Sequence, residues 1–341
     1  MLIFSNCLTN KADEGCLKLA TSIVKRIKQK DENVFVISFE RMFSLSDINL
    51  EINKFHINRQ LISLIRKKKQ PVLYIPFPAP SFSMSLRIWL LSLFARYGLR
   101  VIMVREYPMN RVARWLLRSS KAELVVFSKD AFDFFHLIVG DRIMYLKTGV
   151  DTEKFTPVTP AKVRELKVKY GFDPDKPLVL HVGHMKSGRN IAELMKIDSK
   201  YQILLVVSTL SKERQNQELK EKLLKCSNIR ILDVYVPEIQ EIYQMCDVYF
   251  FPVKQLGYCI DIPLSCLEAA SCNKPVVTTD YGKMRAFIGC KGFVHIQNFN
   301  ETTINDCIEY ALRQSKENIR QQILLYDWTY AVNMLDSDLI V

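Results

Sequence analysis

The sequence lacks a long apolar run, a secretory leader and paired cysteines. Its longest apolar stretches, such as residues 88–95, fall well short of the roughly 20 residues that a membrane-spanning helix needs. The first residues, MLIFSNCLTNK, place no basic segment before their short apolar part, so we expect no signal peptide. The nine cysteines form no C-x-x-C pair, and several lie among apolar residues as buried thiols do. We therefore expect a cytoplasmic protein whose thiols are reduced.

Metal-binding spacing is also missing. The five histidines show no paired ligand spacing. Two D-x-D triplets, at residues 173–175 and 336–338, lie in a linker and in the C-terminal tail, away from strand ends that would hold a metal. We therefore expect neither a metal nor another cofactor.

Acidic residues are scarce in the first half of the chain. Residues 1–150 contain 24 Lys and Arg against 12 Asp and Glu, so the whole net charge of +12 belongs to this half. Such asymmetry points to an anionic partner, either a membrane surface or a nucleic acid. Because no recognised nucleic-acid-binding motif accompanies the charge, we expect a membrane surface rather than a nucleic acid.

Two segments of the first half mix tryptophan, leucine and arginine. Residues 83–96 and 111–118 have the composition of helices that lie in a membrane interface, which favours peripheral binding to an anionic surface. The alternative is that both are core helices whose arginines face solvent. The densest charge cluster, Arg66-Lys67-Lys68-Lys69, fits a solvated helix end as well as a binding role.

Short β-branched and aromatic runs alternate with amphipathic segments of helix length along the whole chain. This pattern predicts an α/β protein with parallel sheets, and 341 residues suit two domains of about 150 residues each. The predicted strands are 2–6, 34–39, 54–57, 72–76, 101–104 and 123–127, then 178–182, 202–207, 228–232, 248–252 and 275–279. The predicted helices include 15–29, 83–97 and 111–119. Ligands of parallel sheets bind at the carboxyl ends of strands, so the loops there are the candidate sites.

The turn after the predicted strand 178–182 is rich in potential cations. It reads GHMKSGRN, and His184, Lys186 and Arg189 precede the next helix. Such residues could stabilise negative charge on a bound or departing phosphate group. An arginine can hold phosphate oxygens in a bidentate fork. A surface turn without a function has the same composition, so both interpretations stay open.

A second candidate anion site follows the predicted strand 248–252. The sequence predicts a helix that starts near Ser265, and the free N–H groups at its start could cradle a phosphate. Ser265 and Glu268 also fit the S-x-x-E capping box, which would give Glu268 a structural role. Alternatively, Glu268 holds two ribose hydroxyls, as acidic residues do in dinucleotide-binding folds.

Three further segments resemble motifs of one enzyme family. Residues 148–155, TGVDTEKF, resemble an interdomain signature GVD-x-x-x-F, and residues 267–277, LEAASCNKPVV, resemble LEAMACGKPVV. Asp327-Trp328 resembles the segment SWE. With these motifs the chain resembles the GT-B glycosyltransferases, specifically retaining family four (glycosyl transferases group 1), over about residues 120–335.

The resemblance implies an α/β fold of two Rossmann-like domains that face each other across a cleft. Residues 1–155 would form the acceptor-binding domain, residues 156–320 the domain that binds the nucleotide sugar, and residues 321–341 a C-terminal helix that crosses back to the first domain.

The resemblance also implies roles for individual residues. His184 falls where the family usually has an arginine and Arg189 where it usually has a lysine, and both would bind the diphosphate. The N–H groups of Leu264 and Ser265 would bind the diphosphate as well, and Glu268 would bind the nucleotide ribose.

Departures from the family pattern affect the catalytic side of the site. Ile260 stands where the first glutamate of the E-x7-E pair is expected, so either Asp261 beside it contacts the donor sugar or Asp261 is a loop residue. The usual histidine of the first domain is absent, and Glu106 stands there. Glu106 either contacts the acceptor or the reacting sugar, or forms an ion pair. Gly15 would let the backbone approach the donor phosphates closely.

We therefore expect a retaining, metal-independent glycosyltransferase that moves a sugar from a UDP- or GDP-sugar to a glycan or lipid-linked acceptor. Two alternatives remain: a nucleotide-sugar epimerase of the same fold, and a catalytically degenerate subunit that binds a sugar or a protein partner. The missing glutamate motivates the second alternative. We expect a cytoplasmic protein that binds the inner face of the membrane peripherally.

Overall fold

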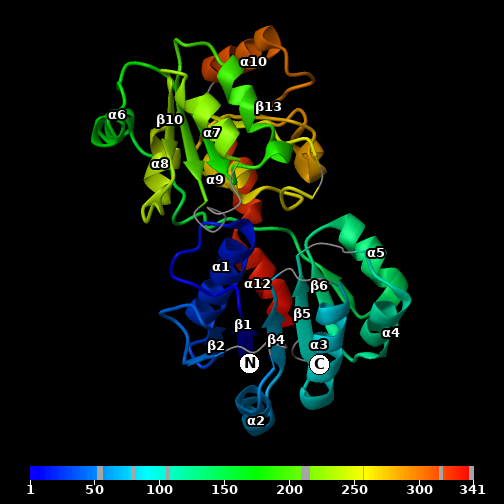
Figure 1. Cartoon of the computed structure of the whole chain (residues 1–341). Helices are drawn as coiled ribbons and strands as arrows, with labels where there is room; N and C mark the ends of the chain where they lie inside the picture. The colour runs from blue at the N-terminus through cyan, green and yellow to red at the C-terminus, as the bar shows by residue number, and fades with distance from the viewer. Residues whose placement is uncertain are drawn as a thin grey trace. The chain divides into compact units, whose positions relative to one another are not determined.

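The chain forms two compact units (Figure 1). The computed structural model describes residues 1–51, 57–77, 81–104, 108–208, 216–255, 257–314 and 318–337. The first unit comprises Met1–Thr148 and the C-terminal segment from Trp328, and the second comprises Gly149–Asp327. The chain thus leaves the first unit before residue 155, where we placed the boundary, and returns to it at Trp328 rather than at residue 321.

The first unit contains a parallel sheet with the order β3-β2-β1-β4-β5-β6-β7. Its strands are β1 (Leu2–Ser5), β2 (Phe35–Phe39), β3 (Ile48–Leu50), β4 (Val72–Ile75), β5 (Leu99–Met103), β6 (Glu123–Val126) and β7 (Ile143–Tyr145). Phe4 of β1 stacks on Tyr74 of β4 with ring centroids 4.5 Å apart, and both side chains are buried. Apolar side chains on adjacent strands therefore form the centre of this core.

Helices connect these strands. They are α1 (Gly15–Lys30), α2 (Arg59–Lys68), α3 (Ser81–Phe94), α4 (Arg111–Ser119) and α5 (Lys129–Val139). Asn58, Asn110 and Ser128 each accept a hydrogen bond from a backbone N–H in the first turn of α2, α4 and α5.

The last helix, α12 (Trp328–Ser337), belongs to the first unit although it ends the chain (Figure 1). Its Asn333 accepts a hydrogen bond of 3.0 Å from Lys30 of α1, and Arg100 of β5 donates to the carbonyl of Leu335. Trp328 is buried and packs edge to face on Phe127.

The second unit repeats the architecture with the order β10-β9-β8-β11-β12-β13, again with parallel pairing. Its strands are β8 (Leu178–Gly183), β9 (Gln202–Val207), β10 (Ile229–Leu232), β11 (Val248–Phe251), β12 (Val276–Thr278) and β13 (Phe293–His295). The α-helices are α6 (Pro160–Lys169), α7 (Gln217–Leu224), α8 (Ile239–Met245), α9 (Leu264–Ser271), α10 (Glu301–Arg313) and α11 (Ile319–Ile323).

The predicted α/β class and the two parallel sheets are confirmed. The strand predicted at 54–57 lies, except for Ile57, outside the described residues, and Ile57 is not in a strand. Three strands were not predicted, namely β3, β7 and β13, which are three residues long and lie at sheet edges. A run of three residues is too short to show a strand period.

The segment that resembles the interdomain signature is anchored within the second unit. Val150 forms an isolated parallel bridge with Asp327 and donates its N–H to the carbonyl of Tyr326 at 2.7 Å. The carboxylate of Asp327 accepts hydrogen bonds from the N–H and the hydroxyl of Thr152, at 3.1 and 2.6 Å. The two ends of the second unit are therefore joined side by side.

Arg320 of α11 strengthens this junction. Its guanidinium donates to the carbonyls of Thr152, Phe155 and Ser271, at distances of 2.7, 2.6 and 2.9 Å, and also to the hydroxyl of Ser271 at 2.9 Å. One side chain thus satisfies carbonyls of the signature segment and of α9 together.

We predict that Arg320→Ala lowers the free energy of unfolding of the second unit by about 3 kcal/mol, because several partly buried carbonyls lose a charged donor. Urea denaturation followed by circular dichroism measures this. The control is Arg313→Ala in α10, whose exposed i,i+4 pair with Glu309 should contribute less than about 1 kcal/mol. Equal effects of the two substitutions would contradict the prediction.

Candidate functional site

The candidate site of the second unit lies where the strand order reverses. β8 is flanked by β9 on one side and by β11 on the other, so the loops that follow β8 and β11 leave the same edge of the sheet from adjacent strands. These loops, residues 184–190 and 257–263, hold the predicted His184, Lys186, Arg189 and Asp261. The sheet topology therefore brings both candidate anion sites of the sequence together.

Arg189 joins the two loops. Its Nε and Nη2 donate to the carbonyl of Tyr258 at 3.1 and 2.8 Å, and Nη2 lies 3.7 Å from the sulfur of Cys259. The side chain is only 7% exposed. The guanidinium therefore forms the predicted bidentate fork, but toward a backbone carbonyl. Its third nitrogen, Nη1, takes no part in this contact.

Two glycines allow this close approach. A Cβ at Gly183, the last residue of β8, would overlap Nη1 of Arg189, and a Cβ at Gly188 would overlap the ring of Tyr258. Any larger residue would push the arginine or the tyrosine away. The two loops are therefore packed against each other without space for an additional side chain.

The environment of His184 disfavours its protonation in the absence of a ligand, and its predicted cationic role toward a diphosphate stays a prediction. Burial, followed by the positive charges of Arg189 and Lys186, lowers the pKa of His184 to about 3, so the imidazole is neutral at physiological pH. Lys186 is partly exposed, and tight turns link its N–H to the carbonyl of His184 and its carbonyl to the N–H of Arg189, both at 3.0 Å. Positive charge in this turn comes from Lys186 and Arg189.

A second histidine, which is not among the predicted site residues, lies beneath this turn. His181 of β8 is fully buried, and its Nδ1 lies 2.8 Å from the carbonyl of Phe250, so Nδ1 carries the proton. Burial is the main cause that lowers its pKa to about 4, and Arg189 contributes in the same direction. Its Nε2 has no hydrogen-bond partner within the described part of the chain.

The helix that carries the second candidate site begins at Leu264, not at Ser265. Its N-cap residue is Pro263, whose side chain cannot accept a hydrogen bond, while the Pro263 carbonyl accepts from Cys266 at 3.0 Å. The capping-box interpretation of Ser265 and Glu268 is therefore wrong, because the N-cap residue is Pro263, two residues before the Ser265 that this motif requires as N-cap. The first turn of α9 keeps backbone N–H groups at Leu264 and Ser265 that no N-cap side chain satisfies.

Glu268 lies in the second turn of α9, where only 4% of its surface is exposed. Its neighbours are the hydroxyl of Tyr243 and the thiol of Cys266. Burial, followed by the charge of Glu268, raises the pKa of Tyr243 well above its ordinary value. Burial also raises the pKa of Cys266, and Glu268 contributes to that shift. The carboxylate thus lies near two buried groups that stay neutral, and its contact with ribose remains a prediction.

Asp261 is partly exposed, and its backbone is fixed. Its carbonyl accepts a hydrogen bond of 3.1 Å from the N–H of Lys283. Its charge is one of the causes that raise the pKa of Tyr281, after burial and Cys259. Asp261 therefore lies beside Tyr281 at the loop between β11 and α9.

The remaining predicted site residues belong to the first unit. Gly15 is the first residue of α1, and a Cβ there would meet open space, so close packing does not require glycine. The carboxylate of Glu14 caps this helix by accepting from the N–H groups of Cys16 and Leu17 at 2.9 and 3.2 Å. A phosphate at this helix start would therefore meet a carboxylate. Glu106 lies outside the described residues.

Within the described residues, no group of three or more His, Cys, Asp or Glu side chains could hold a metal ion. Of the first D-x-D triplet, Asp175 forms an exposed ion pair of 2.7 Å with Arg164, and Asp173 accepts from the backbone of Asp175. In the same part of the chain, no helix is long and apolar enough to cross a membrane.

Solved structures show which fold this is. The chain is similar to a glycosyltransferase from Rickettsia africae, with a TM-score of 0.78 and 16% identity, over 99% of this chain and 97% of that one. It is also similar to HepE from Anabaena, crystallised with UDP-glucose, with a TM-score of 0.76 and 12% identity, over 99% of each chain. At these identities the likeness shows the fold, which is the GT-B fold of two Rossmann-like domains.

Sequence comparison adds the family. Residues 162–323 match the family described as glycosyl transferases group 1. Sulfoquinovosyl transferase SQD2 of Arabidopsis thaliana is 23% identical over 249 residues, which are 68% of this chain and 46% of that protein. The match thus spans less than half the length of this relative. The match to the glycosyl transferases group 1 family thus covers residues 162–323, slightly less than half of the chain.

The two buried histidines predict how stability depends on pH. Their folded pKa values, about 4 and about 3, lie below the ordinary value of 6.5, so only the unfolded chain takes up these protons as the pH falls from about 6.5 to 4. The free energy of unfolding should fall in this window by up to about 1.4 kcal/mol per pH unit for each imidazole. His181→Asn should reduce the loss between pH 7 and pH 5 by about 2 kcal/mol.

Urea denaturation at the two pH values measures this difference. His136→Asn is the matched control, because His136 is exposed on α5. The assignment of His181 as a buried neutral imidazole fails if both variants keep the pH dependence of the original chain.

Proposed function

We propose that this chain is a retaining glycosyltransferase that moves a sugar from a UDP- or GDP-sugar to a glycan or lipid-linked acceptor without a metal ion. The observation that carries the proposal is the position of Arg189, Lys186 and the start of α9 at the switch point of the second sheet. The complex of Anabaena HepE with UDP-glucose supports a nucleotide-sugar donor for this fold. The retaining outcome and the metal independence rest on the family motifs.

The chemistry requires stabilisation of the leaving diphosphate. When the bond between the anomeric carbon and the phosphate oxygen breaks, negative charge grows on that oxygen, and preorganised cations and N–H groups lower the barrier. In the proposal, Lys186, Nη1 of Arg189 and the N–H groups of Leu264 and Ser265 supply this stabilisation. The neutral His184 supplies a hydrogen bond instead of a charge.

Other residues would hold the rest of the donor and the acceptor. Glu268 would accept from the ribose hydroxyls, and Asp261 would contact the donor sugar in place of the missing glutamate at position 260. Glu106 stays a predicted contact of the acceptor or the reacting sugar.

We predict that Arg189→Ala lowers kcat/KM for the donor about 100-fold, because the leaving diphosphate loses a cation and the loop loses its anchor. Arg189→Lys, which keeps the charge without the fork, should recover part of the loss. Nucleotide release across a panel of UDP- and GDP-sugars, with and without a membrane lipid extract, measures this. Lys225→Ala, at an exposed position, is the control.

The same assay separates the alternatives. An epimerase would convert the donor sugar without any acceptor, and a degenerate subunit would bind UDP or GDP in calorimetry without turnover. Turnover that is unchanged in both Arg189→Ala and Glu268→Ala would overturn the assignment of the site.

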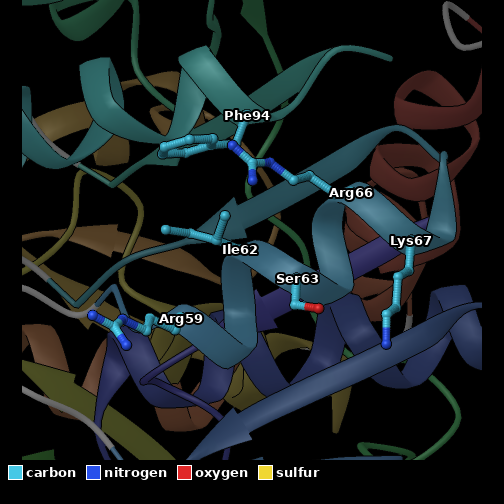
Figure 2. A pocket seen from close by; sticks show the side chains of 6 residues that line it. All are labelled: Arg59, Ile62, Ser63, Arg66, Lys67 and Phe94. Atoms are coloured by element: carbon cyan, nitrogen blue, oxygen red, sulfur yellow. The ribbon is translucent and has the colours of Figure 1, made fainter.

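We propose in addition that the first unit binds a membrane surface that carries acidic phospholipids. Arg59, Ile62, Ser63, Arg66 and Lys67 lie along one face of α2 and, with Phe94 of α3, line a pocket of about 450 Å³ (Figure 2). The guanidinium of Arg66 lies over the Phe94 ring, 4.9 Å from its centroid. The lining contains three cations and no carboxylate, so a phosphate headgroup above apolar carbons is its complement.

The helices next to this pocket support the membrane proposal in part. The inner face of α3 packs in the core, where Ile88 and Leu91 are buried. This agrees with the alternative interpretation of these segments as core helices. Their outer faces nevertheless expose Leu93 of α3 by 54% and Trp115 of α4 by 59%. Exposed apolar residues beside cations are typical of an interfacial surface.

We predict that the double substitution Arg66→Glu with Lys67→Glu reduces binding to phosphatidylglycerol-containing vesicles at least about tenfold, since each basic residue near such a surface contributes about 1 kcal/mol. Co-sedimentation measures the bound fraction. Lys225→Glu with Lys291→Glu, an equal charge change at exposed positions of the second unit, should have a smaller effect. Equal losses in both double variants, or equal binding of the original chain to neutral phosphatidylcholine vesicles, would refute this surface.

A further inference from the structure

The later part of the loop between β11 and α9, residues 257–263, is held through three of its backbone carbonyls. The donor and acceptor pairs are Arg189 to Tyr258, Tyr281 to Cys259, and Lys283 N–H to Asp261. The donors follow β8 and β12, which flank β11 on its two sides in the sheet. The loop is therefore held from both neighbouring strand ends.

Tyr281 makes the central attachment. Its hydroxyl donates to the carbonyl of Cys259 at 2.6 Å and accepts from the N–H of the same residue at 2.9 Å. Burial is the main cause that raises the pKa of Tyr281 to about 12, so the hydroxyl keeps the proton that it donates. The ring is 3% exposed and packs edge to face on Phe251, and the Tyr281 N–H donates to Thr279 at 3.2 Å. The Tyr281 ring and backbone are thus both held in place by contacts outside the loop.

Gly282 makes the third attachment possible. It has a φ of +51°, and a Cβ there would overlap the carbonyl oxygen of Asp261. Only glycine meets both conditions without strain. The next N–H, of Lys283, can then reach the Asp261 carbonyl at 3.1 Å.

We propose that Tyr281 and Gly282 are positioning residues for the nucleotide-sugar donor. By fixing Cys259 and Asp261, they determine where the Asp261 side chain and the first N–H groups of α9 stand relative to the end of β8. Neither residue touches the donor in this proposal. The inference rests on the proposed function, because it assigns the loop to donor binding.

Tyr281→Phe removes the hydroxyl and keeps the ring. We expect KM for the donor sugar to rise about tenfold while kcat stays within about threefold, because a displaced loop weakens donor binding before it affects the chemistry. Gly282→Ala should act in the same direction and serves as the second variant if Tyr281→Phe does not fold. The matched control is Tyr170→Phe, whose hydroxyl bonds to Glu241 at 2.7 Å away from the loop. It should leave KM unchanged.

Hydrogen exchange gives a readout that does not depend on the donor. The amide of Cys259 should exchange at least about tenfold faster in Tyr281→Phe than in the original chain or in Tyr170→Phe. Unchanged exchange would overturn the attachment itself. Faster exchange together with an unchanged donor KM would show a purely structural role and overturn the positioning role. If the original chain turned over no nucleotide sugar, the proposed function and the positioning role would both fall, whereas the exchange result would still decide the attachment.

Discussion

The contact between the Arg189 guanidinium and the Tyr258 carbonyl is the constraint on which the rest of the site depends. It joins the loops of two adjacent strands, and it does so with a partner that carries only a partial negative charge. A carboxylate would neutralise the arginine, whereas a carbonyl leaves most of its positive potential in place. The lowered pKa values of His181 and His184, to which Arg189 contributes after burial, report the same potential. The two loops therefore carry a positive potential that suits the anionic donor of the proposed function.

The fold could be predicted because its strands are long enough to show a pattern. β9 has the predicted bounds, and β8 and β11 differ from theirs by one residue at one end. The strands that were not predicted are short and lie at sheet edges. Whether such a segment becomes a strand depends on its pairing with one neighbouring strand and not on its own composition. The boundary between the two units could not be predicted closely for a similar reason. Contacts such as those of Arg320 with Phe155 and Ser271 join segments that are far apart in sequence.

The site was predictable where a motif carries its own chemistry, and not where neighbours from elsewhere in the chain change it. Cationic residue types suggested His184 as a charge, but burial beside Arg189 makes it neutral. Spacing suggested a capping box at Ser265, but Pro263 begins the helix earlier. Nothing in the sequence near Tyr281 indicates its two hydrogen bonds to Cys259, because sheet topology alone brings these residues together.

Two departures from the family pattern meet in one contact. Position 189 carries an arginine where a lysine is usual, and position 260 carries Ile260 where a glutamate is usual. A lysine is a point charge, whereas a guanidinium presents donors in a planar fork and can hold the Tyr258 carbonyl while Nη1 remains directed toward Gly183. The fork therefore anchors the loop that contains Ile260 beside the neighbouring strand, which a lysine at position 189 could not do with two parallel donors.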